Sequence, residues 1–77
     1  MMHVSENEYK WMVEQVVSDM IGLLIEHEGY DFTHAFETVY ASATYQALLK
    51  PETNLYSQSS GYVYSYLISE IKTGKMD

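Results

Sequence analysis

One long amphipathic segment, residues 6–28, limits how the rest of this 77-residue chain can fold. Residues 5–8 fit a helix capping box with Ser5 as N-cap, and Val4 and Tyr9 are placed to form the accompanying hydrophobic staple. Gly29 then supplies a left-handed C-terminal cap. The segment predicts a helix about 35 Å long, so the remaining elements must pack against its sides.

Steps of 100° per residue divide this predicted helix into two sides. One broad apolar side is expected to face the core: Tyr9, Met12, Val13, Val16, Val17, Met20, Leu23 and Leu24. The opposite side carries a stripe of Trp11, Ser18, Gly22 and Ile25. Because glycine inside a helix costs about 1 kcal/mol relative to alanine, this stripe indicates close packing by the C-terminal segment or a second subunit. The alternative is a partly exposed tryptophan and a tolerated glycine.

A second helix is predicted over residues 32–49, with Asp31 as its N-cap. Its apolar positions share one face: Phe32, Ala35, Phe36, Val39, Tyr40 and Ala43. The pattern shifts at Ser42, where serine and threonine side chains compete for backbone hydrogen bonds. We therefore expect a kink or a break near Ser42, and an end at Lys50 because the residue before proline disfavours the helical conformation.

The loop over residues 51–58 and the last helix complete the chain. Asn54 tolerates a left-handed turn conformation, and Leu55 and Tyr56 are apolar enough to anchor the loop to the core. Ser59 or Ser60 caps a helix over residues 60–72, and Gly74 stops it. The buried side of this helix is expected to hold Val63, Tyr64, Leu67 and Ile71, with Ile68 at its margin.

These elements predict an all-α class: one helical domain over residues 1–77, a small bundle of three main helices (about 6–28, 32–49 with a kink near 42, and 60–72). A chain of this size buries only about 60% of the surface that its unfolded form exposes. With no cysteine, disulfides and the usual thiolate zinc sites are excluded. Self-association would supply the missing apolar area, so we predict a homodimer.

The charge balance restricts the partners. The chain carries a formal net charge of −7 with four basic residues, all of them scattered lysines. Nucleic-acid binding depends on basic groups that neutralise phosphates, so the composition argues against it and suits a basic protein partner. No apolar run approaches the roughly 18 residues that span a bilayer. The acidic start is unlike a signal peptide, so we expect a cytoplasmic protein.

His27 and His34 flank the first turn and are the only candidates for a metal site. They lie near Glu26, Glu28 and Asp31, but they lack a recognised zinc-binding spacing. Surface residues around a turn are the ordinary interpretation. A regulatory module that binds a small molecule or metal at the His27–His34 turn is kept as the alternative function.

No pattern of a catalytic nucleophile or of a phosphate-binding loop is present, so we expect neither an enzyme nor a cofactor. Tyr62 and Tyr66 lie one turn apart on the polar side of the last helix, and aromatic residues of this kind are enriched at interfaces. The main hypothesis is a small acidic interaction module, an antitoxin-like or regulatory partner. Its expected partner-binding residues are Trp11, Ser18, Gly22, Ile25, Tyr62 and Tyr66.

The C-terminal segment carries one extended motif: Pro51-Glu52-Thr53-Asn54-Leu55-Tyr56, then Gln58-Ser59, Tyr62-Val63-Tyr64 and Leu67. This PET(G/N)LYxQSxxYVxxxL-like segment resembles a pattern in a group of small uncharacterised bacterial all-helical proteins, in which glycine is usual at the place of Asn54. With looser matches at Asp31, Ala35 and Phe36, the resemblance covers about residues 30–71. It implies a short helical protein of the kind encoded near small reading frames, including toxin–antitoxin-like ones, and no biochemical activity.

Overall fold

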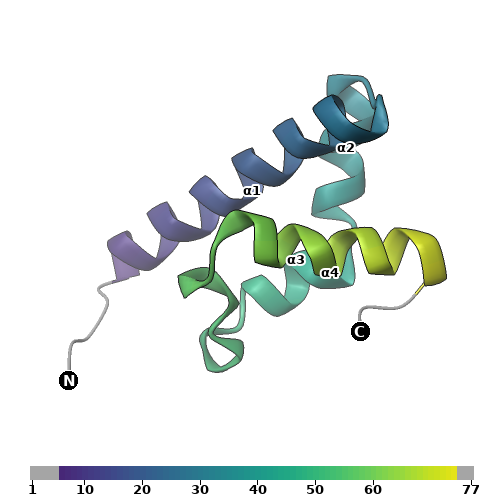
Figure 1. Cartoon of the computed structure of the whole chain (residues 1–77). Helices are drawn as coiled ribbons and strands as arrows, with labels where there is room; N and C mark the ends of the chain where they lie inside the picture. The colour runs from purple at the N-terminus through teal and green to yellow at the C-terminus, as the bar shows by residue number, and fades with distance from the viewer. Residues whose placement is uncertain (1–5, 75–77) are drawn as a thin grey trace.

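The computed structural model describes residues 6–74, which are all-α and contain no strand. In chain order the elements are α1 (Glu6–Glu28), α2 (Phe32–Tyr40), α3 (Ala43–Leu48), the 3-10 turns η1 (Pro51–Thr53) and η2 (Leu55–Ser57), and α4 (Ser60–Thr73). Figure 1 shows α1 as the longest element, with α2 turning back from its C-terminal end. Both α2 and α4 pack on α1, and α4 also packs on α3. The predicted fold class is confirmed.

The predicted ends of α1 and α4 agree with local backbone geometry. Gly29 and Gly74 both have a positive φ, 73° and 78°, at the C-terminal ends of the two helices. The Ser59 side chain accepts a hydrogen bond from the Tyr62 amide and is therefore the N-cap of α4. The expected cap at Ser5 and the staple at Val4 lie outside the described residues. Thus α1 has its predicted bounds, and α4 extends one residue further than expected.

The second predicted helix is two helices, because the chain breaks at Ser42. The buried Ser42 hydroxyl donates to the Val39 carbonyl at 2.6 Å and accepts from the Tyr45 amide at 2.9 Å. This one side chain therefore satisfies a carbonyl at the end of α2 and an amide at the start of α3. The predicted break is confirmed. Asp31 is also confirmed as the N-cap of α2, because its side chain accepts a hydrogen bond from the His34 amide.

The predicted loop over residues 51–58 contains the two 3-10 turns, joined by Asn54 in the left-handed region at φ 58°. Leu55 is buried, and Tyr56 packs edge-on against Tyr9 with ring centroids 4.9 Å apart. The expectation that these two side chains anchor the loop is confirmed. They hold it against the N-terminal half of α1.

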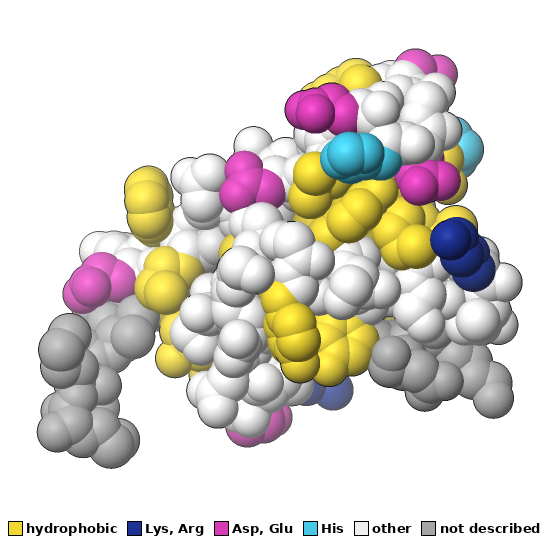
Figure 2. Space-filling view, in the orientation of Figure 1, with side chains coloured by type: hydrophobic (Ala, Val, Ile, Leu, Met, Phe, Trp, Pro, Cys, Tyr) yellow, Lys and Arg dark blue, Asp and Glu magenta, His cyan; other side chains and the backbone are white. Residues whose placement is uncertain are grey.

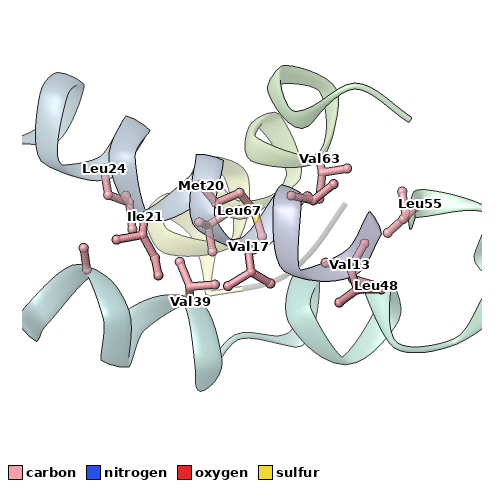
Figure 3. Packing of buried hydrophobic residues seen from close by; sticks show 12 residues of the cluster. Val13, Val17, Met20, Ile21, Leu24, Val39, Leu48, Leu55, Val63 and Leu67 are labelled. Atoms are coloured by element: carbon pink, nitrogen blue, oxygen red, sulfur yellow. The ribbon is translucent and has the colours of Figure 1, made fainter. Parts of the chain in front are cut away.

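The core lies along one side of α1, where aliphatic side chains from α2, α3, η2 and α4 pack against it (Figure 3). Its buried members are Val13, Val16, Val17, Met20, Ile21, Leu24, Ala35, Val39, Leu48, Leu55, Val63 and Leu67. Tyr9, Tyr64 and Ile68 are partly buried against this cluster. Figure 2 shows further hydrophobic side chains at the surface between the C-terminal part of α1 and α4.

One prediction about burial is wrong, and α2 buries only part of its apolar face. Ile71, expected on the buried side of α4, is 40% exposed, because the last turn of α4 extends beyond α3 (Figure 1). On α2, only Ala35 and Val39 of the predicted apolar face are fully buried, whereas the three aromatic rings remain exposed. Since Ala35 and Val39 are small, they let α2 approach α1 closely, and the larger rings lie at the edge of the contact.

Candidate protein-interaction surface

A ladder of aromatic rings runs along the exposed edge of α2. The ring centroids of Phe32 and Phe36 are 5.9 Å apart, those of Phe36 and Tyr40 are 4.6 Å apart, and Tyr45 of α3 continues the row at 4.8 Å from Tyr40. Phe32 is 62% exposed and Phe36 44% exposed. Spacing by four residues on a helix places these rings one above another, and we call Phe32, Phe36 and Tyr40 the aromatic ladder.

The aromatic ladder forms one wall of a groove of about 320 Å³ between α2 and α1. The residues of α1 that line it are Glu14, Val17, Ser18 and Ile21. We call this the α1–α2 groove. Its lining is apolar except for Ser18 and the carboxylate of Glu14, and exposed aromatic side chains such as those of its wall are enriched at protein interfaces.

A second groove, of about 410 Å³, lies on the other side of Ser18 and has a mixed polar and apolar lining. Asp19, Gly22, Leu23 and Glu26 of α1 line it together with Ser60 and Gly61 at the start of α4. Asp19 accepts a hydrogen bond of 2.6 Å from the Ser60 hydroxyl, which fixes the first turn of α4 against α1. We call this the acidic groove.

The predicted stripe on the back of α1 lies at the surface. Trp11 is 65% exposed, and Ser18 and Ile25 are also exposed. A Cβ atom at Gly22 would meet nothing within 4 Å, so no described part of the chain packs closely on this glycine. Within residues 6–74 the close contact expected from the C-terminal segment is therefore absent, and contact by a second subunit stays a prediction.

Acidic side chains line both grooves, and no lysine or arginine lines either one. Between Lys10 and Lys50 the sequence contains no lysine or arginine, although this stretch includes most of α1 and all of α2 and α3. Figure 2 shows acidic side chains spread along α1. The surface around the α1–α2 groove therefore has a negative potential.

Of the predicted tyrosine pair of α4, Tyr62 is exposed, whereas Tyr66 is partly buried against the core cluster. The Tyr62 and Tyr66 hydroxyls share a hydrogen bond at 3.0 Å, and the rings are edge-on at 5.3 Å. This hydrogen bond, more than the nearby charge or burial, raises the pKa of the Tyr66 hydroxyl. No charged residue occurs between Glu52 and Glu70. We call Tyr62 and Tyr66 the tyrosine pair.

The two histidines of the first turn contact aromatic rings. His34 stacks on Tyr30 with centroids 4.1 Å apart and planes 3° from parallel, and His27 lies 6.4 Å from Tyr64. Among residues 6–74, no group of three or more histidine and carboxylate side chains is arranged to hold a metal ion. Binding of a small molecule or metal at the His27–His34 turn stays a prediction that no contact of this turn favours.

Glu70 has a structural role that the sequence did not predict. Its carboxylate accepts hydrogen bonds from the Ala43 amide at 2.7 Å, the Thr44 amide at 2.9 Å and the Thr44 hydroxyl at 2.8 Å. It thus caps the first turn of α3 from a distant helix. The available signal was spacing, because Glu70 falls on the line of the buried residues Val63 and Leu67.

Comparison with known proteins adds no relative to this description. No protein-family model, curated protein or solved structure matches the chain. The resemblance to small bacterial helical proteins therefore stays a prediction. None of the helices within residues 6–74 combines the length and the apolar content that crossing a membrane requires.

Proposed function

We propose that this chain is a small acidic, cytoplasmic protein–protein interaction module, a regulatory or antitoxin-like partner, that binds through the α1–α2 groove. The observation that carries the proposal is the exposed aromatic ladder. Phe32, Phe36 and Tyr40 form one continuous row on α2 but remain exposed. The residues that α2 contributes to the core are Ala35 and Val39. Large exposed aromatic side chains in contact with one another favour a binding surface.

The size of this surface fits a protein partner. An aromatic side chain offers about 150–250 Å² of surface, so the exposed parts of the three rings amount to on the order of 300 Å². Trp11 and Ile25 add further exposed apolar area along α1. A specific interface buries about 800 Å² on each partner, so the three rings can form the central apolar part of such an interface.

A photo-crosslinking phenylalanine analogue at position 32 tests the proposal in living cells that express the chain. The matched control carries the same analogue at position 71, since Ile71 is also an exposed apolar side chain but lies on α4, away from both grooves. We expect a discrete protein adduct from position 32 that position 71 does not give and that Phe36→Ala reduces. Equal adducts from both positions, or none from position 32, would contradict the proposed function.

A further inference from the structure

The shape and the charge of the α1–α2 surface point to one kind of occupant. We propose that the α1–α2 groove binds a basic amphipathic helix of a partner protein, with apolar side chains against the aromatic ladder and lysine or arginine side chains over the flanking acids. This inference rests on the proposed function and specifies the partner.

The groove has the form and length that suit a helix. It lies between two helices, and a helix in such a groove is held by anchors at positions i, i+3 or i+4, and i+7. The groove runs from Glu14 to Ile21 on α1 and from Phe32 to Tyr40 on α2, seven and eight residues, and is thus about 10–12 Å long. A partner helix of about eight residues, slightly more than two turns, matches this length.

The apolar contact has two parts. Phe32, Phe36 and Tyr40 form a wall against which branched aliphatic side chains can pack. Next to this wall, α1 presents Ser18. Gly22 lines the acidic groove on the other side of Ser18, and a Cβ atom there would meet no neighbour within 4 Å. A partner backbone can therefore approach α1 closely here, while its larger side chains extend over the rings.

The charges favour a basic partner over a second copy of this chain. Glu14 lines the α1–α2 groove, and Asp19 and Glu26 line the acidic groove beside it. No lysine or arginine lines either groove. A second copy would bring the same three carboxylates to the contact, and like charges placed together at an interface are unfavourable. Lysine or arginine on the flank of a partner helix would complement them.

Titration of the full chain, labelled with ¹⁵N, against designed peptides of about fourteen residues tests this inference. The basic peptide has leucine on one helical face and lysine on its flanks. A second peptide replaces each lysine with glutamate, and a third keeps the basic composition but distributes its leucines around the helix. We expect the basic amphipathic peptide to bind at least about tenfold more tightly than either of the others. The affinity of this peptide should fall as the salt concentration rises. The amide signals of the labelled chain that shift on binding should belong to α1 and α2.

Two variants locate the contact. Phe36→Ala should weaken binding of the basic peptide at least about tenfold, whereas Ile71→Ala, a loss of similar exposed apolar area on α4, should leave it unchanged. Because Phe36→Ala could also disturb α2, the second variant reverses exposed charges only. Glu14→Lys with Glu26→Lys should make the chain prefer the glutamate peptide, and thermal unfolding of each variant confirms that it is folded.

Equal affinity for the basic and the glutamate peptide, or shifts confined to α4, would overturn the inference. So would a dimer of this chain that Phe36→Ala dissociates, because the second copy would then occupy the groove. In either case an adduct specific to position 32 would still support the interaction function. If there is neither an adduct specific to position 32 nor binding of the basic peptide, both the proposed function and the inference about a basic helix are contradicted.

Discussion

Glu70 gives the sharpest test of how this fold is held together. Its carboxylate joins α4 to the first turn of α3 through hydrogen bonds from the Ala43 amide and from the amide and hydroxyl of Thr44. Thr44 is fully buried, so its donors have no direct access to water. We predict that Glu70→Ala destabilises the protein more than removal of any solvent-facing acid.

The expected magnitude follows from these contacts. A hydrogen bond to a charged group contributes about 1.5–3 kcal/mol, and a buried donor left without a partner costs about 1–3 kcal/mol. The Ala43 amide belongs to an exposed residue and can turn to water. Counting mainly the Thr44 donors gives a loss of about 2–4 kcal/mol for Glu70→Ala. The whole free energy of unfolding of such a chain is only about 4–12 kcal/mol, so the melting temperature should fall by about 10–25 °C.

The pH dependence separates this interaction from simple packing. Burial tends to raise the pKa of Glu70, but the hydrogen bonds from Ala43 and Thr44 outweigh it and lower the pKa below the ordinary glutamate value of 4.5. Because the pKa is lower in the folded state, the carboxylate stabilises the fold above pH 4.5, and this contribution is lost as the pH falls through the lowered pKa. The difference between the unmodified chain and Glu70→Gln should therefore shrink in acid.

Urea unfolding followed by far-ultraviolet circular dichroism, at neutral and at acidic pH, measures both effects. Glu37→Gln on the exposed surface of α2 is the matched control and should change the free energy of unfolding by less than about 0.5 kcal/mol. If Glu70→Gln behaves like Glu37→Gln at neutral pH, the carboxylate does not cap α3. If Glu70→Gln lowers the free energy of unfolding by the same amount at both pH values, the stabilisation does not come from the ionised carboxylate.

Three further predictions concern other contacts. Tyr9→Phe removes the 2.8 Å hydrogen bond to the Leu48 carbonyl and should lower the free energy of unfolding by about 1 kcal/mol in urea; no loss would mean that water replaces this bond. Asn54→Ala should lower it by about 1–2 kcal/mol because φ is 58°, whereas Asn54→Gly should not, and equal losses would contradict a backbone cause. Light scattering should give the mass of a homodimer, which Tyr62→Ser with Tyr66→Ser reduces to a monomer; a monomeric unmodified chain would refute this.

Local signals explain why the helix bounds could be predicted from the sequence. Gly29 and Gly74 adopt the left-handed conformation that ends α1 and α4, and Asp31 and Ser59 accept hydrogen bonds from first-turn amides. Each of these interactions involves residues within a few positions along the chain. The break at Ser42 was predictable for the same reason, since its partners are Val39 and Tyr45.

Contacts between distant segments could not be predicted in this way. Glu70 looks like an ordinary charge on a helix surface until α3 is placed beside α4, because its partners lie 26 and 27 residues away. The aromatic rings of α2 share an apolar face with Ala35 and Val39, and periodicity alone does not decide which members of that face reach the core. The candidate surface at Trp11, Ser18, Gly22 and Ile25 was found from spacing, but the groove beside it depends on where α2 packs.

The exposed aromatic ladder follows from the way in which this small chain builds its core. Ala35 and Val39 have no exposed surface and are the residues of α2 that belong to the buried core along α1. Residues this small bring the two helix axes close together, and at that separation no space is left between the helices for rings at positions 32, 36 and 40. A leucine at position 35 would hold the helices further apart and allow the rings to turn inward, with less apolar surface left for a partner. The close packing that stabilises the fold is therefore also the reason why the groove has an aromatic wall.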